Sequence, residues 1–423
     1  MHLPILLPLA ASAGAASFPF LYRQSSQHIL SRPSPPAPRP KIGGLVAFGD
    51  SYSAGIGTPI AGKENDCRQG TGAYPFLIAA DLLPNTTAPS SSSNTTDVPP
   101  FQWLSCTGST TADLLAGGGG ASSQIDRFNT TPVLDVATLS IGGNDLGFFD
   151  VMNACVFRFY SFYSGTCEAA LAASDAQIAG PEFDLRLGLV LREILDKVRW
   201  ERRPGFVVTV TGYARFFDET TEGCDEVSLG VWWGVGADGR GPRLTREVRG
   251  RMNELVVRVN DKIRRAVEGV NAEFVRPRVV FVDYDAAFEG HRFCEVGVEE
   301  PDYQRNETWF FFPGGPDNGA GGNGTGGGVE ETLAPDSPLV SPKTCLPAAE
   351  KSRDWGELAL CYMAMARHRD PTLRPREGVV NENSMWYVPT SYGKTFHPRS
   401  LGHEAIRDKV YEAWAGHGVG MGH

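Results

Sequence analysis

The chain has 423 residues, of which 41% are hydrophobic and 21% charged, so it is long enough for one large domain or two smaller ones. The formal net charge is −10, the pI is about 5.4, and no run of Lys or Arg is longer than a pair. These features disfavour binding to phosphate backbones and to anionic lipids, so we expect no nucleic-acid partner. No later apolar run is long enough for a transmembrane segment.

The first residues, MHLPILLPLAASAGAASFP, form an apolar segment that is too short to span a bilayer. It ends in small residues at 13–15, as a secretory signal does, so we predict a signal peptide over 1–15 and a secreted, extracellular protein. The alternative is a buried N-terminal strand, which the lack of Lys or Arg ahead of the apolar run favours. Residues 16–41 contain the proline-rich stretch SRPSPPAPRPK and are predicted to be a linker or a removed propeptide.

Glycosylation sequons and an even number of cysteines support secretion. Eight cysteines allow on the order of a hundred connectivities, and pairing neighbours in order gives bridges that each close a modest loop. Zinc is the rival interpretation, but no CxxC or HxxxH spacing occurs, so we expect no metal. The cysteines are Cys67, Cys106, Cys155, Cys167, Cys224, Cys294, Cys345 and Cys361. The sequons begin at Asn85, Asn94, Asn129, Asn306 and Asn323, of which Asn129 is weakened by Pro132.

From Ile42 onward, short apolar strands alternate with helices that have one apolar face, a pattern typical of a parallel sheet with crossover helices. The predicted strands, rich in β-branched residues and apolar on both faces, are 43–48, 136–141, 205–210 and 278–284. The predicted helices are 74–83, 187–198, 248–267 with Thr245 as its cap, and 402–414. The expected fold class is α/β, a three-layer α/β/α sandwich with a central parallel sheet and loop insertions.

Two stretches do not fit this pattern and are predicted to be surface insertions. Residues 86–100 are polar and carry a sequon, and residues 312–331 are very rich in glycine. The glycine-rich part, 313–331, is expected to be disordered because it would lose too much backbone entropy on ordering.

Polar residues follow two of the predicted strands, where ligands bind in parallel sheets. The first strand ends in GDSY and the second in IGGND at 141–145. Gly49 permits a sharp turn that presents the Ser51 hydroxyl at the start of a helix, a position that suits a nucleophile. The alternative is a Ser or Asp helix cap, and a dinucleotide site is disfavoured because GxGxxG spacing is missing.

Four ordered blocks decide between these alternatives: GDSYSAGIG, CTGSTTADLL (106–115), SIGGNDLGFF (140–149) and FHPRSLGHEAI (396–406). Together they resemble the blocks of the SGNH (GDSL) hydrolase family. The segments GYARFF (212–217) and EGHRFCE (289–295) resemble its secreted esterase and lipase subgroup from streptomycetes. The resemblance covers roughly 42–296 and 384–412. It implies an SGNH, flavodoxin-like domain over 42–415, with an insertion at about 297–390.

The resemblance implies a role for each matching residue. Ser51 is similar to the nucleophile and His397 to the general base. The backbone N–H groups of Ser51 and Gly108 and the side-chain amide of Asn144 are similar to the oxyanion hole. These roles suit the chemistry, since serine needs a base to take its proton and the oxyanion needs preset donors. His403 competes with His397, but it lies within the helix and is expected to pack or cap.

Many family members carry an aspartate three residues before the base, where this chain has Lys394. A lysine cannot accept the hydrogen bond from Nδ1, so we expect the main-chain carbonyl of Lys394 to do so, giving a Ser-His dyad. Accordingly, Lys394→Ala is expected to leave most of the activity. Asp50 and Asp145 are interpreted as residues that brace turns and loops. A Cys67–Cys106 bridge, offered as a hypothesis, would join the nucleophile and oxyanion loops.

The expected function is a secreted, monomeric carboxylic ester hydrolase that works through an acyl-serine intermediate, with no cofactor. Its partner is a small-molecule, lipid or polymer-borne ester. The alternatives are a carbohydrate acetyl esterase, a phospholipase, or a catalytically silent binding protein, which would not need to keep all four site residues. Substrate choice stays open. Two roles are open for a set of aromatic residues: they line an acyl groove or a sugar platform, or they merely cover the sheet. These residues are Trp232, Trp233, Trp309, Phe310 and Trp386.

Overall fold

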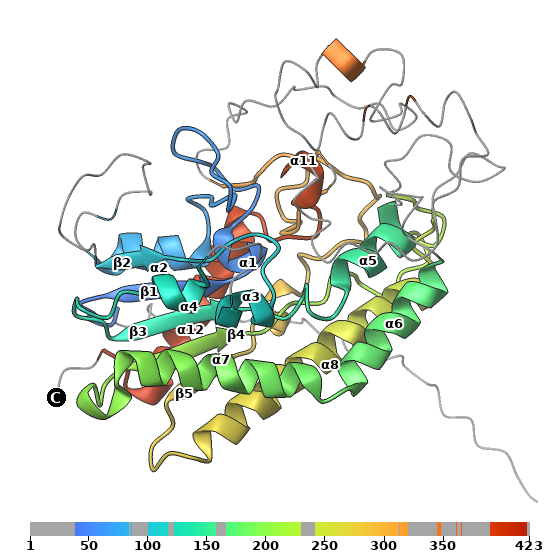
Figure 1. Cartoon of the computed structure of the whole chain (residues 1–423). Coiled ribbons are helices and arrows are strands. Elements are labelled where there is room, and N and C mark those ends of the chain that lie inside the picture. The colour runs from blue at the N-terminus through green and yellow to red at the C-terminus, as the bar shows by residue number, and fades with distance from the viewer. Residues whose placement is uncertain are drawn as a thin grey trace, which may run out of the picture. The chain divides into compact units, whose positions relative to one another are not determined.

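The computed structural model (Figure 1) describes residues 39–83, 86, 100–116, 122–157, 166–229, 242–312, 314–319, 345–347, 361, 365 and 390–420. All of them belong to one unit, Ala37–His423. The predicted signal peptide, most of the proline-rich segment and most of both predicted insertion loops lie outside the described residues.

Five parallel strands form one sheet with the order β2-β1-β3-β4-β5. The strands are β1 (Leu45–Gly49), β2 (Phe101–Trp103), β3 (Val136–Ser140), β4 (Val207–Thr211) and β5 (Val279–Val282). The four predicted strands are confirmed, and almost every residue in them is buried, as expected for a parallel sheet covered on both faces. The chain runs from β1 to the edge strand β2, crosses back to β3 and continues outward on the other side.

The edge strand β2 was not predicted. It has only three residues, follows two prolines and pairs with β1 alone. Such a short segment carries too few side chains to show the alternation by which strands are found in a sequence.

The predicted helices are confirmed as α2 (Tyr74–Leu82), α7 (Glu182–Val198), α8 (Arg246–Asn271) and α12 (Ser400–His417). The Thr245 hydroxyl accepts a hydrogen bond from the Val248 N–H at 3.3 Å, which is the predicted cap. The remaining helical elements are α1 (Ser51–Ala54), α3 (Thr111–Ala116), α4 (Gln124–Arg127), α5 (Phe148–Met152), η1 (Asn153–Phe157), α6 (Cys167–Ala179), η2 (Trp200–Arg202), η3 (Asp285–Phe288) and α11 (Thr390–Gly393).

The helices form two layers around the sheet (Figure 1). Helices α2 and α12 pack together on one face, where the Trp414 indole of α12 donates to the Thr209 hydroxyl of β4 at 2.7 Å. Helices α7 and α8 pack together on the other face. The three-layer α/β/α fold with a central parallel sheet is therefore as expected. No helix in the described ranges is both long and apolar enough to cross a bilayer.

Four disulfides join all eight cysteines, each to its neighbour in chain order. This confirms the pairing considered from the sequence. The bridges are Cys67–Cys106, Cys155–Cys167, Cys224–Cys294 and Cys345–Cys361.

Candidate active site

The turn after β1 presents Ser51 at the carboxyl end of the sheet. Gly49 has a φ of +125°, and a Cβ there would come within 2.1 Å of the Ser140 carbonyl oxygen, so only glycine fits. Asp50 caps helix α1, its side chain accepting from the Tyr52 N–H at 3.0 Å. Ser51 therefore begins the helix and is buried.

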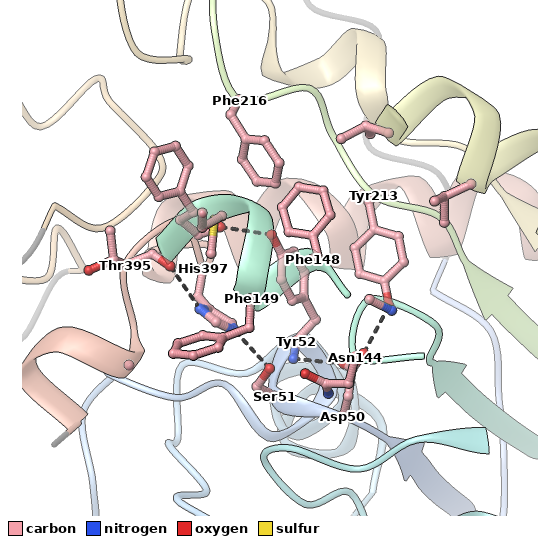
Figure 2. Close-up of a pocket in the computed structure, with 16 residues that line it drawn as sticks. Asp50, Ser51, Tyr52, Asn144, Phe148, Phe149, Tyr213, Phe216, Thr395 and His397 are labelled. Atoms are coloured by element: carbon pink, nitrogen blue, oxygen red, sulfur yellow. Dashed lines mark hydrogen bonds between the residues drawn. The ribbon is translucent and has the colours of Figure 1, made fainter. Parts of the chain in front are cut away.

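His397 reaches Ser51 from the far end of the chain. Its Nε2 atom lies 2.6 Å from Ser51 Oγ, across 346 positions of sequence (Figure 2). The histidine segment is held against residues 309–312, since the Phe396 N–H donates to the Phe311 carbonyl and the Phe311 N–H donates to the His397 carbonyl, both at 3.0 Å. The structure thus brings the predicted nucleophile and base into contact.

The ring of His397 is oriented by a main-chain carbonyl, but that of Thr395 instead of Lys394. Its Nδ1 atom lies 3.2 Å from the Thr395 carbonyl oxygen, which can only accept, so Nδ1 carries the proton and Nε2 is free to accept from Ser51. The Lys394 carbonyl accepts the backbone N–H of His397 at 2.9 Å. The prediction was therefore one residue out, because the chain makes a tight turn between these residues.

The side chain of Lys394 takes no direct part in this arrangement. Its ammonium group lies over the ring of Phe311, 4.6 Å from the centroid, and burial lowers the pKa of this amine to about 8. Its aliphatic stem packs so closely on Gly57 that a Cβ there would come within 2.6 Å of it.

Burial sets the protonation of the His397 imidazole. It lowers the pKa of His397 from 6.5 to about 4, and the weaker effects of the Thr395 and Lys394 backbones raise this pKa. A lowered pKa keeps the imidazole neutral, and so able to take a proton, in more acidic solution than an exposed histidine allows.

We expect kcat/KM to stay nearly constant down to about pH 5 and to fall only as the pH approaches the pKa of His397. The measurement is a pH–rate profile, with folding checked by circular dichroism at each pH. Burial also raises the pKa of Asp50 to about 7. Protonated Asp50 still has a lone pair on each oxygen and can accept its two hydrogen bonds, so we expect its titration to change kcat/KM less than that of His397. A loss of activity centred near pH 7 would contradict this expectation and would show that the titration of Asp50 sets the pH dependence of kcat/KM.

Asn144 lines the same pocket as Ser51 and His397 (Figure 2). Its amide donates to the carbonyl of Ser109 at 2.9 Å, which places it beside Gly108 and leaves its second N–H available. Gly108 has a φ of +87°. Among hydrogen bonds between described residues, none uses the backbone N–H of Ser51 or of Gly108. Gly108 itself is not among the residues that line the pocket.

The Cys67–Cys106 bridge joins the segment after the nucleophile helix to the segment that carries Gly108, as hypothesised. The Thr107 N–H and hydroxyl both donate to the Cys67 carbonyl, at 3.2 and 3.0 Å. The bridge and these bonds restrain the segment that carries Gly108.

Replacing both Cys67 and Cys106 by serine is expected to lower the free energy of unfolding by about 4 kcal/mol, because the bridge closes a loop of 39 residues. We expect kcat to fall as well, since the oxyanion loop loses its restraint. Denaturant unfolding and steady-state kinetics measure the two effects. The matched control replaces Cys345 and Cys361, which close a shorter loop of 16 residues and share no residue with the site segments. Equal losses of activity in both variants would contradict the local role.

Asp50 and Asp145 brace the two turns, as interpreted from the sequence. Asp145 accepts the backbone N–H of Thr111 at about 3.0 Å and also its hydroxyl, and burial raises the pKa of this carboxyl. Asp50 accepts the hydroxyl of Tyr213 at 2.8 Å. Helix α3 and the segment after β4 are thereby tied to the edge of the sheet that carries Ser51.

Apolar side chains form much of the rest of the pocket, together with the polar residues Asp50, Tyr52, Tyr213 and Thr395 (Figure 2). The apolar residues are Phe148, Phe149 and Met152 of α5, Val256 and Val259 of α8, and Phe216 and Phe396 from loops. The sequence reasoning missed them, although the two phenylalanines of α5 follow the IGGND motif directly. Of the aromatic residues named instead, Phe310 lies in the buried core and Trp309 stacks on His291, with centroids 3.6 Å apart. Trp232, Trp233 and Trp386 lie outside the described residues.

The competing histidine, His403, is fully buried on α12. Its Nδ1 accepts from the Tyr74 N–H at 3.3 Å and its ring stacks on that of Tyr74. It therefore packs, as expected, and among the described histidines His397 is the one that contacts Ser51.

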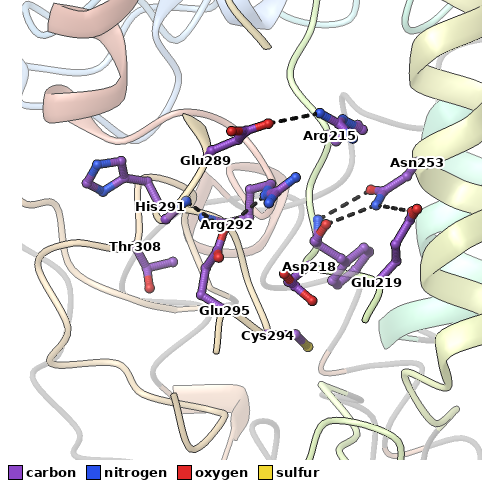
Figure 3. A network of polar contacts seen from close by, with 12 residues as sticks. Arg215, Asp218, Glu219, Asn253, Glu289, His291, Arg292, Cys294, Glu295 and Thr308 are labelled. Carbon is purple, nitrogen blue, oxygen red and sulfur yellow. Dashed lines mark hydrogen bonds and ion pairs between the residues drawn. The ribbon is translucent and has the colours of Figure 1, made fainter. Parts of the chain in front are cut away.

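The two subgroup-like segments, 212–217 and 289–295, lie side by side (Figure 3). The Phe293 N–H donates to the Phe216 carbonyl at 2.8 Å, and ion pairs such as Arg215 with Glu289 surround the contact. The rings of Phe216 and Phe293 pack against Phe396, with centroids 5.2 and 4.9 Å apart. These segments support the residue that precedes His397.

The sequons differ in exposure. Asn306 is exposed, whereas Asn129 is half-buried and its side-chain oxygen accepts from the Thr131 N–H and hydroxyl. Asn85, Asn94 and Asn323 lie outside the described residues.

Comparison with known proteins identifies the family. The model of the GDSL-like Lipase/Acylhydrolase family matches residues 47–293, which is more than half of the chain. The chain belongs to this family. The match begins within β1 and spans the segments that carry Ser51, Gly108 and Asn144. It stops before His397.

Two relatives of this GDSL-type protein are streptomycete lipases. Lipase 1 of Streptomyces coelicolor is 33% identical over 175 residues, 41% of this chain and 53% of that protein. The lipase of Streptomyces rimosus is 31% identical over 182 residues, 43% and 56% of the two chains. The chain thus spans about half the length of each. The crystal structure of phospholipase A1 from Streptomyces albidoflavus NA297 is 27% identical, with a TM-score of 0.41, over 60% of this chain and 84% of that one.

Proposed function

We propose that this GDSL-family protein is a carboxylic ester hydrolase that forms an acyl-enzyme on Ser51. The observation that carries the proposal is the 2.6 Å contact between Ser51 Oγ and His397 Nε2, in a pocket that Asn144 also lines. A serine hydroxyl in contact with a neutral, oriented imidazole is the arrangement that activates it for attack on an ester.

The residues divide the reaction as follows. Ser51 Oγ attacks the ester carbonyl carbon while its proton passes to His397 Nε2, and the Thr395 carbonyl holds the resulting imidazolium. The Asn144 amide, with the N–H groups of Ser51 and Gly108, stabilises the oxyanion. His397 then returns the proton to the leaving alcohol. Water repeats the sequence on the acyl-enzyme, releasing the acid and restoring Ser51.

The apolar walls of the pocket support an aliphatic acyl group as the part of the substrate that enters. Five of the lining side chains are apolar and offer no polar partner for a sugar: Phe148, Phe149, Met152, Val256 and Val259. An acetyl group would fill little of this surface. We therefore favour an esterase or lipase, in line with the two relatives named lipases, over a carbohydrate acetyl esterase.

The test is hydrolysis of p-nitrophenyl esters of rising acyl length, with acetylated xylan and a phospholipid, together with labelling by an alkyl phosphonate. We expect activity to rise beyond the acetate ester, and a peptide map to place the label on Ser51. Ser51→Ala should lose both activity and label, whereas the matched Ser53→Ala, two residues along the same helix, should keep both. Activity on acetylated xylan alone would favour the acetyl esterase, and no activity with no label would leave a binding protein.

We also propose that the protein is exported after removal of residues 1–15 and acts as an extracellular monomer whose domain spans 42–415. Its four disulfides support an oxidising destination. N-terminal sequencing of the secreted protein tests the removal of residues 1–15, and light scattering tests the monomer. The mass before and after deglycosylation tests whether glycans are attached. Asn306 is expected to carry a glycan because it is exposed.

A further inference from the structure

Three chain segments that are distant in sequence must hold their spacing for the proposed reaction: the nucleophile turn, the Asn144 turn and the histidine loop. Two buried tyrosines connect them. Tyr52 follows Ser51 in α1, and Tyr213 follows β4 by two residues. Their rings meet edge to face, with centroids 5.0 Å apart, beside the catalytic pair (Figure 2).

The hydroxyl of Tyr213 connects the nucleophile turn to the Asn144 turn. It donates to Asp50 Oδ2 at 2.8 Å and accepts from the Gly143 N–H at 3.1 Å. Asp50 precedes Ser51 and Gly143 precedes Asn144, so one oxygen atom joins the residues that carry the nucleophile and the oxyanion donor. The backbone of Tyr213 is itself fixed, since the Asn260 amide exchanges two hydrogen bonds of 2.8 Å with its N–H and carbonyl.

The hydroxyl of Tyr52 connects the nucleophile helix to the histidine loop. It donates to the Phe396 carbonyl at 2.7 Å. Phe396 precedes His397 and has a φ of +65°, a conformation that an aromatic residue adopts only when its surroundings impose it. The ring of Tyr52 also lies 4.9 Å from that of His397. This bond therefore fixes the peptide unit from which the base extends.

We propose that Tyr52 and Tyr213 are positioning residues: Tyr52 sets the place of His397 relative to Ser51, and Tyr213 sets the place of Asn144. The assignment rests on the proposed roles of Ser51, Asn144 and His397. Neither hydroxyl needs to touch the ester. Each acts by holding a neighbouring peptide group, in a reaction where small displacements of the reacting groups are costly.

The test uses Tyr52→Phe and Tyr213→Phe, which remove one oxygen and keep the packed rings. We expect each to lower kcat by roughly 10- to 100-fold with little change in KM, and to slow phosphonate labelling of Ser51 in parallel. The matched control is Tyr411→Phe on α12, which removes a similar hydrogen bond to a carboxylate, that of Asp81, at 3.2 Å. It should leave kcat unchanged.

Double variants separate positioning from general loosening of the fold. Tyr213→Phe should cost almost nothing further when Asn144 is already alanine, and Tyr52→Phe almost nothing further when His397 is already alanine. In the crossed pairs, Tyr213→Phe with His397→Ala and Tyr52→Phe with Asn144→Ala, the losses of transition-state stabilisation should add. If Tyr213→Phe fails to fold, Asp50→Asn provides a second way to weaken the Tyr213 bond and should show the same pattern as Tyr213→Phe.

The proposal is overturned if folded Tyr52→Phe and Tyr213→Phe keep wild-type kcat, or if their losses match those of Tyr411→Phe. It is also overturned if each tyrosine variant loses the same factor in kcat in wild type, in Asn144→Ala and in His397→Ala. Loss of activity and label in Ser51→Ala is measured alongside, so failure of the tyrosine assignment is distinguishable from failure of the proposed function.

Discussion

Replacing His397 by alanine is expected to reduce kcat by roughly 10⁴-fold or more, because Ser51 then has no group to take its proton. Among the described histidines, His397 is the one whose ring contacts the Ser51 hydroxyl, at 2.6 Å. Residues of a dyad act as one unit, so the Ser51→Ala/His397→Ala double variant should be no less active than either single variant. Burst and steady-state kinetics with a p-nitrophenyl ester measure these effects.

The control for this variant is His417→Ala, at the exposed end of α12, where the ring forms a hydrogen bond with the Ala413 carbonyl and lies away from Ser51 in the sequence and on the helix. It should behave as wild type. Folded His397→Ala protein that retains substantial activity would rule out the dyad, and multiplied losses in the double variant would show that the two residues act independently.

Replacing Asn144 by alanine is expected to reduce kcat by about 10²- to 10³-fold, with KM nearly unchanged. The amide contributes where charge develops on the substrate oxygen, so it stabilises the transition state more than the bound ester. Its bond to the Ser109 carbonyl fixes the amide before substrate arrives, and this avoids a cost of reorganisation during the reaction.

Two observations check that interpretation. Phosphonate labelling of Ser51 should slow along with kcat, since the phosphoryl oxygen uses the same donors. Asn144→Asp keeps the size of the side chain but replaces the donor by an acceptor, so it should be at least as damaging as alanine. An increase in KM with kcat preserved would instead place Asn144 in ground-state binding.

Local chemistry predicted much of the fold. Strand β1 and helix α8 were predictable because their signals lie within single segments: apolar residues on both faces of Leu45–Gly49, and a repeating stripe after the Thr245 cap. The edge strand Phe101–Trp103 was not, because three residues define no pattern.

The candidate site needed more than local chemistry. Ser51 stood out at a strand tip, but its partner lies 346 residues away, and only the resemblance of four blocks to a family pointed to His397. The carbonyl that orients the ring could not be assigned correctly, because it depends on the positive φ of Phe396, which nothing in a phenylalanine side chain encodes. The pocket phenylalanines of α5 look like ordinary core residues in the sequence.

The order of synthesis gives the wide separation of nucleophile and base a further meaning. A ribosome synthesises the serine hundreds of residues before the histidine, and in the folded structure the histidine segment is held by backbone hydrogen bonds to residues 309–312. A half-made chain therefore carries an inert hydroxyl. If the protein acts and is exported as proposed, the growing chain cannot hydrolyse esters until His397 has been synthesised and has reached Ser51.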